Sequence, residues 1–105
     1  VFRGGWIGDV ADARNFLGAF AGDGALNWPG YDDARYRELF AKADAARNET
    51  VRNAWLRAAE TRLLHAHALI PLYFYTSKHL VSPQVAGFEA NPLDRHPSRW
   101  LQLRQ

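Results

Sequence analysis

The segment Phe2-Arg3-Gly4-Gly5-Trp6-Ile7-Gly8-Asp9 carries one charge near each end of an apolar, glycine-rich stretch. We expect it to be a β-strand, and side chains at even spacing share one face of a strand. Arg3 and Asp9 then point the same way, with Trp6 on the opposite face. Extended geometry separates the two charges by about 20 Å, a distance that a bend at a glycine shortens. A cation and an anion at the ends of an apolar slot suit a zwitterion such as a peptide. An ordinary core strand with charged ends has the same pattern.

Three helices are predicted between this segment and Ile70. A short one begins after Asp12, and a longer one begins after Asp32-Asp33, whose carboxylates cap free amides and favour the positive helix end. The last begins after Asn48 and ends before Pro71, which lacks an amide and disfavours helical geometry in the preceding residue. Apolar residues at helical spacing form one stripe on each long helix: Tyr36, Leu39, Phe40 and Ala43, then Leu56, Ala59, Leu63 and Ala66. The short connection between these two helices predicts an antiparallel pair.

The remaining segments predict strands and a loop. Residues 70–81 alternate in the manner of a strand, and residues 99–103 predict a last strand. Tyr73-Phe74-Tyr75 is aromatic and half polar, which suits a face looking into a cleft, although tyrosine is also common in ordinary strands. Residues 21–30 contain several glycines and Pro29 and predict a loop. Helices and strands together predict an α+β fold in one module, residues 1–105.

Composition excludes several classes of partner. The 105 residues include 13 basic and 11 acidic side chains, giving a net charge of +2. The basic residues are scattered, so we expect no nucleic-acid partner. The chain has no cysteine, which excludes disulfides and thiolate metal sites. No apolar run approaches the roughly 20 residues that span a bilayer, so we expect only indirect contact with a membrane. The first residue is Val1, and no targeting segment follows it.

Neither a metal site nor an active site is predicted. His65 and His67 are two positions apart on a helix and point about 200° away from each other, so they do not chelate one ion. His79 and His96 lie on separate predicted elements, whereas a zinc site needs three or four converging ligands. No nucleophile elbow, phosphate loop or metalloprotease motif occurs. We therefore predict no metal, no cofactor and no enzymatic activity.

Four features, in order, resemble the extracytoplasmic peptide-binding proteins of ABC importers, the family 5 solute-binding proteins, which include oligopeptide, dipeptide and nickel binders. They are Trp6-Ile7-Gly8-Asp9 followed by Phe16-Leu17, Tyr31-Asp32-Asp33 opening a helix, the segment from Ala68 to Tyr75, and Pro92-Leu93-Asp94. The resemblance covers nearly the whole chain but only the C-terminal portion of the family, whose members are several times longer. It implies a C-terminal segment of a two-lobed periplasmic-binding-protein-like fold. In that fold we expect the helical pair to pack on a mixed sheet, with the final strands returning to the other lobe.

The resemblance also implies a function, namely capture of a peptide or related small solute for delivery to an ABC permease. The expected location is periplasmic, or extracellular and membrane-anchored in a Gram-positive organism. In the family, an aspartate buried in the closed cleft pairs with the ligand ammonium, and Asp9 matches it. The other residues implied as ligand contacts are Arg3 for the ligand carboxylate, Tyr75 for the ligand backbone, Trp6 bordering the pocket, and Asn27 and Trp28 near the cleft. Trp28 serves equally well as a structural anchor of its loop.

A function of another class is compatible with the same residues. A small α+β interaction module would grip a protein partner with its helical pair or with the Trp28 loop. A large exposed aromatic patch would favour this alternative. A long extension upstream of Val1 that ends in a signal peptide would favour the solute binder instead.

Overall fold

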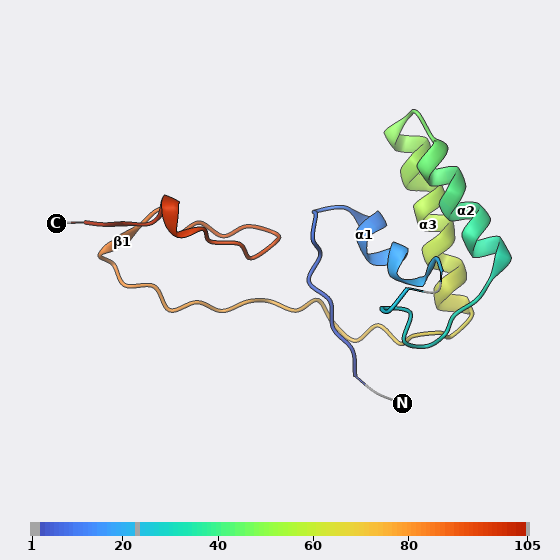
Figure 1. Ribbon diagram of the computed structural model, residues 1–105, viewed down its shortest axis with the longest axis horizontal. Coiled ribbons are helices and arrows are strands. Elements are labelled where there is room, and N and C mark those ends of the chain that lie inside the picture. The colour runs from blue at the N-terminus through green and yellow to red at the C-terminus, as the bar shows by residue number, and fades with distance from the viewer. Residues whose placement is uncertain (1–2, 23, 105) are drawn as a thin grey trace. The chain divides into compact units, whose positions relative to one another are not determined.

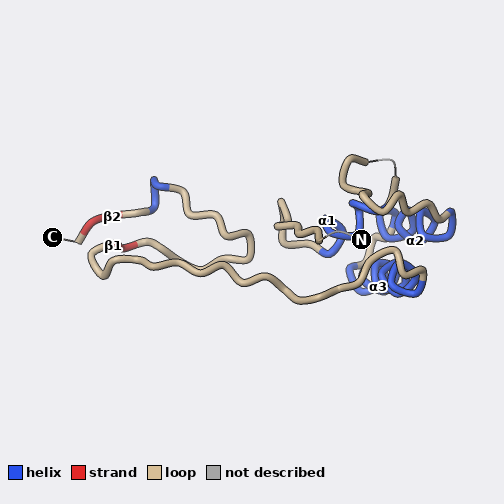
Figure 2. The backbone as a smooth tube through the Cα atoms, turned by 90° about the horizontal axis from the view of Figure 1, so that it is seen from below, coloured by secondary structure: helices blue, strands red, loops and turns tan. Residues whose placement is uncertain are grey.

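The computed structural model describes residues 3–22 and 24–104. Its contacts divide the chain into two units, Val1–Leu72 and Tyr73–Gln105. The first unit holds the long helices, and the second holds a short β-hairpin (Figures 1 and 2). In chain order the elements are α1 (Ala13–Leu17), η1 (Gly18–Phe20), α2 (Ala34–Ala45), α3 (Glu49–His65), β1 (Val85–Ala86), η2 (Ser98–Trp100) and β2 (Gln102–Leu103). Among the described residues, no helix is both long enough and apolar enough to cross a bilayer.

The helices begin where the sequence predicts caps. The carboxylate of Asp33 accepts a hydrogen bond from the Tyr36 amide at 2.8 Å, and Asn48 Oδ1 accepts from the amides of Thr50 and Val51. These bonds satisfy amides that have no partner within the helix. Arg62, in the last turns of α3, binds Asp33 at the start of α2 at 2.8 Å. The two helices are therefore antiparallel, as predicted, and they lie side by side in Figure 1.

The core forms where α2 and α3 meet α1. All four predicted stripe residues of α2 are buried, and so are three of the four on α3. Ala66 is the exception, because α3 ends at His65 and Ala66 is its exposed C-cap. Tyr36 has no exposed surface, and its hydroxyl donates to the carbonyl of Leu17 at 2.7 Å. This bond fixes the end of α1 against α2.

Ion pairs hold α1 on the helical pair. Asp12 caps α1 as predicted, and its carboxylate also accepts two hydrogen bonds from Arg52 of α3, at 2.8 and 2.9 Å. Arg14 of α1 binds Asp44 of α2 through two nitrogens. Bidentate geometry of this kind fixes orientation as well as distance. It places the residues that precede α1 relative to the helical pair.

The stability of this unit should fall in acid because of Asp33. The Arg62 guanidinium, together with the Tyr36 amide, lowers the pKa of Asp33 from 3.8 to about 2. A carboxylate whose pKa is depressed by folding stabilises the folded state above its unfolded pKa and loses that contribution as the pH falls through the folded value. We expect the free energy of unfolding to decrease between pH 4 and pH 2, and to decrease less in Asp33→Asn. Urea titrations at a series of pH values measure this, and identical slopes for the two proteins would contradict it.

Two predicted strands are absent from the described residues. Residues 3–8 have no regular structure, and neither do residues 70–82. The described residues hold three α-helices and one two-stranded sheet, so the mixed sheet under the helical pair stays a prediction. The physical reason for the two absent strands is that a strand forms only when its backbone groups bond a neighbouring strand. An alternating pattern shows that a segment suits a sheet, but it does not supply the partner.

The last predicted strand is confirmed in part. Gln102 and Leu103 form β2, which pairs antiparallel with β1 in the register Val85 to Leu103. Gly87 follows β1 with φ +82°, and a Cβ there would lie 1.8 Å from the carbonyl oxygen of Trp100. Only glycine fits both the backbone angle and this close approach. Gly87 thus allows the two arms of the hairpin to meet.

Candidate functional site

The segment around Trp6 and Asp9 is held in place by one side chain of α1. Asn15 Oδ1 accepts hydrogen bonds from the Asp9 amide at 2.9 Å and from Trp6 Nε1 at 3.3 Å. Gly8, in the same segment, is buried against α1. A Cβ on Gly8 would lie 2.9 Å from Phe16 Cζ and 3.1 Å from Asn15 Oδ1. A side chain at position 8 would push the segment off α1. Asn15 was not predicted as a site residue, and its position just after the Asp12 cap was the only signal.

The structure gives the two charged candidates an open environment. Arg3 and Asp9 are both exposed, whereas Trp6 is half-buried. The resemblance implies an aspartate shielded from water in the closed cleft, and the described residues 3–22 and 24–104 leave Asp9 exposed. An ammonium group would therefore pair strongly with Asp9 only if another surface closed over it.

The loop of residues 21–30 folds back on the segment that contains Arg3. A Cβ on Gly4 would lie 2.5 Å from the Trp28 ring, so the indole packs directly on the backbone beside Arg3. Trp28 keeps 49% of its surface exposed. The side-chain amide of Asn27 binds the carbonyls of Gly22 and Tyr31 and the amide of Tyr31. These bonds give Asn27 a role in shaping the loop, and its contact with substrate stays a prediction.

Tyr75 belongs to the second unit, in an extended segment with little cover. It is 72% exposed, and its neighbour Phe74 is completely exposed. A hollow on this segment is bounded by Tyr73, Phe74, Tyr75, Thr76 and Lys78. Because one short stretch forms all of its walls, the hollow does not enclose a ligand. Tyr73, Phe74 and Tyr75 are all exposed, and their role as a face that looks into a cleft stays a prediction.

Substituting Asn15 tests whether it positions Asp9. In Asn15→Ala the amide of Asp9 and the indole of Trp6 lose their shared acceptor, and each such bond contributes about 1 kcal/mol. We expect faster hydrogen exchange at both groups, by about fivefold for each, while α2 and α3 exchange as before. Asn53→Ala, on the exposed face of α3, is the matched control. Unchanged exchange at Asp9 in Asn15→Ala would show that other contacts hold the segment.

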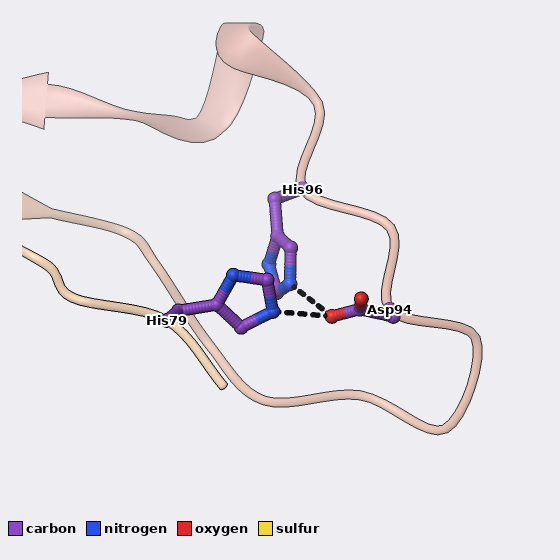
Figure 3. Close-up of side chains that lie close together, drawn as sticks. All are labelled: His79, Asp94 and His96. Atoms are coloured by element: carbon purple, nitrogen blue, oxygen red, sulfur yellow. Dashed lines mark hydrogen bonds and ion pairs between the residues drawn. The ribbon is translucent and has the colours of Figure 1, made fainter. Parts of the chain in front are cut away.

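A separate cluster lies in the second unit and was missed from the sequence. His79 Nε2 lies 2.6 Å from Asp94 Oδ1, and His96 Nε2 lies 3.0 Å from the same oxygen (Figure 3). The two histidines do lie on separate segments, as predicted, but the hairpin brings them together. Hydrogen bonds from Ser77, His96 and His79 lower the pKa of Asp94 to about 2. The long sequence separation of His79 from Asp94 hid this arrangement.

Known proteins similar to this chain are solute-binding proteins. This chain is 31% identical over 99 residues to the dipeptide-binding protein DppE of Bacillus subtilis. It is 29% identical over 100 residues to the periplasmic oligopeptide-binding protein OppA of Escherichia coli. It is also 31% identical over 103 residues to the probable deoxycholate-binding periplasmic protein YgiS of E. coli. No family model matches the chain, and no solved structure matches it either.

These similarities extend along almost all of this chain but along a small part of each relative. They cover 94%, 94% and 97% of the chain, and 17%, 18% and 19% of DppE, OppA and YgiS, respectively. The four sequence features that suggested the resemblance are thus accompanied by identity throughout the chain. The chain is a distant homologue of the family 5 oligopeptide- and dipeptide-binding proteins, and it spans less than a fifth of their length.

Proposed function

We propose that this chain forms part of the ligand cleft of an extracytoplasmic binding protein that captures peptides for an ABC permease. The observation that carries the proposal is the homology to the dipeptide- and oligopeptide-binding proteins over 94% of the chain. The relatives named as periplasmic support the same compartment for this chain. The homologues are solute-binding proteins without enzymatic activity, in keeping with a capture function.

The arrangement of the first unit supports ligand binding at the Trp6–Asp9 segment. Asn15 fixes the backbone of Asp9, and α1 is in turn fixed to α2 and α3 by the Arg14 and Arg52 ion pairs. A carboxylate on a rigid support loses little entropy when it binds a cation. Asp9 takes the ligand ammonium in this proposal, and Arg3 takes the ligand carboxylate through its planar fork.

The exposed segment of residues 70–82 supports participation in a larger sheet. Residues 70–82 are extended and leave apolar side chains in water, with Ile70 78%, Leu72 72% and Leu80 fully exposed. Such a segment is stable only when its backbone and apolar face find partners. We propose that strands outside these 105 residues pair with it, and that a second lobe closes over Asp9 and removes it from water.

A protein-interaction module is the second candidate, and the same exposed segment favours it. An extended segment with Phe74 and Leu80 in water can pair with the sheet edge of another protein. The two candidates differ in what they bind: a small zwitterion between two lobes, or a protein partner without a small ligand.

Peptide binding by a chimera tests the proposal. In E. coli OppA, the segment homologous to this chain is replaced by residues 1–105, and the chimera is titrated by calorimetry with a mixture of tripeptides and, separately, with deoxycholate. We expect about micromolar or tighter binding of tripeptides. We expect no measurable binding to the isolated 105-residue chain, because one lobe does not enclose a ligand.

The controls separate misfolding from loss of function. Cooperative thermal unfolding shows whether the chimera has folded. A folded chimera that binds neither peptide nor deoxycholate would overturn the proposal, and so would micromolar peptide binding by the isolated chain. Binding of deoxycholate without peptide would keep the solute-binding role and change the ligand class.

A further inference from the structure

Three metal-ligating side chains converge in the second unit, and none of them is among the residues proposed for peptide binding. One nitrogen of His79, one oxygen of Asp94 and one nitrogen of His96 all lie within 4.8 Å of one another. Their contacts use His Nε2 in both cases and a single carboxylate oxygen, Asp94 Oδ1. Figure 3 shows both imidazole rings directed at one oxygen of the Asp94 carboxylate. Asp94 and His96 are half-buried, and His79 is exposed.

Aromatic packing holds the two imidazoles. The His96 ring stacks on Phe88 with centroids 3.9 Å apart and planes at 15°, and the His79 ring meets Phe88 edge-on at 5.1 Å. The two imidazoles are 5.0 Å apart and nearly perpendicular. Both rings thus pack on the same phenyl group, and each already directs Nε2 at Asp94 Oδ1.

The turn that carries Asp94 is built from its own hydrogen bonds. Asn91 Oδ1 accepts from the amides of Leu93 and Arg95, and Asn91 Nδ2 donates to the carbonyl of Arg95. Asp94 sits in the left-handed region at φ +51°, which is uncommon for a residue with a side chain. Ser77 adds a hydrogen bond to the Asp94 carboxylate from the first arm of the segment. The oxygen that faces the histidines is therefore oriented by groups other than the histidines.

We propose that His79, Asp94 and His96 form a binding site for a divalent first-row transition-metal ion such as Zn²⁺. Two imidazoles and one carboxylate are a common open set for these ions, with water in the remaining position. Tetrahedral ligands at the usual Zn–N and Zn–O distances lie about 3.3 Å from one another. The present separations from Asp94 Oδ1, 2.6 and 3.0 Å, need to widen by less than about 1 Å.

Metal binding replaces the two imidazole–carboxylate hydrogen bonds. Each imidazole binds the ion through Nε2 as the neutral tautomer with its proton on Nδ1, and Asp94 binds as the carboxylate. Ser77 serves as an outer partner that orients the Asp94 carboxylate. The site does not depend on peptide binding, because it uses none of the residues proposed for that function.

Calorimetric titration of the full 105-residue chain with ZnCl₂ at pH 7.5 tests the site. We expect one ion per chain, with shifts of the His79 and His96 imidazole nitrogens in ¹H–¹⁵N spectra and none for His65 and His67. His79→Ala, Asp94→Asn and His96→Ala should each weaken binding by more than about 100-fold. That loss exceeds the 10–100-fold typical of an outer partner, which we expect for Ser77→Ala.

Two further variants make the result decisive. The double variant His65→Ala/His67→Ala removes the other two histidines and should leave the affinity unchanged. His96→Cys replaces one zinc ligand by another and should retain binding that His96→Ala loses, even if both substitutions disturb the Phe88 stack. The proposal is overturned if no one-to-one binding occurs, if the His65/His67 variant loses it, or if the three ligand variants bind as the parent does.

Discussion

Replacing Tyr36 by alanine should lower the free energy of unfolding of the helical unit by about 3–5 kcal/mol, the usual cost of truncating a buried aromatic side chain. Tyr36 is fully buried, stacks on Phe40 at 6.2 Å and contacts Tyr31 edge-on at 5.3 Å. Its hydroxyl also satisfies the carbonyl of Leu17. The substitution removes the ring from the centre of a small core and leaves that carbonyl without its donor. Urea unfolding followed by far-UV circular dichroism measures the loss.

Tyr36→Phe separates the hydrogen bond from the packing. It keeps the ring and removes only the hydroxyl, so we expect a loss of about 1 kcal/mol. If Tyr36→Ala and Tyr36→Phe lost the same amount, the ring would contribute little and the hydrogen bond would account for the effect. A loss below about 1 kcal/mol in Tyr36→Ala would contradict the burial itself.

Replacing Asp9 by asparagine in the OppA chimera should weaken tripeptide binding by about 2–5 kcal/mol, the cost of removing one partner of a buried charge pair. This corresponds to roughly 30- to 4,000-fold in the dissociation constant. The reason is that closure of the second lobe would leave the ligand ammonium in a dry site without a counter-charge. Isothermal titration calorimetry with one defined tripeptide measures the change. Equal affinity in the parent and the variant would remove Asp9 from the proposed site.

Two controls tie that effect to the ammonium group. Asp32→Asn alters an exposed carboxylate at the start of α2, whose partner is Arg37, and should leave the affinity unchanged. An N-acetylated tripeptide has no ammonium group, so it should bind the parent chimera weakly. Its affinity for the Asp9→Asn variant should equal its affinity for the parent. If Asp9→Asn weakened the acetylated peptide as strongly as the free one, the residue would act through local structure.

The helical unit could be predicted from the sequence because its determinants are local. Asp12, Asp33 and Asn48 cap the three helices as predicted, and the stripe of α2 is buried in full. A cap requires only a side-chain oxygen within three residues of a free amide, and a stripe requires only regular spacing. Both conditions depend only on residues that are close together in the sequence.

Two of the three predicted strands are absent from the described residues because the condition for a strand is not local. The segments of residues 3–8 and 70–82 carry the composition of strands but have no regular structure. Their backbone hydrogen bonds need a neighbouring strand, which a periodic pattern cannot provide. The same limit applies to the ligand contacts. Asp9 and Arg3 were identified by resemblance, while the burial that would make Asp9 a strong partner has to come from another surface.

The amino-acid sequence by itself determined where the helices begin, most of the buried stripes and the resemblance to the family, because each depends on residues close together in the chain or on identity along it. The tertiary structure alone revealed that Asn15 holds the backbone of Asp9, and that His79 meets Asp94 and His96 across the hairpin. These contacts form because turns bring together residues that are separated in the sequence. A left-handed Asp94 and a close approach at Gly87 set that path, and spacing along the sequence does not express it.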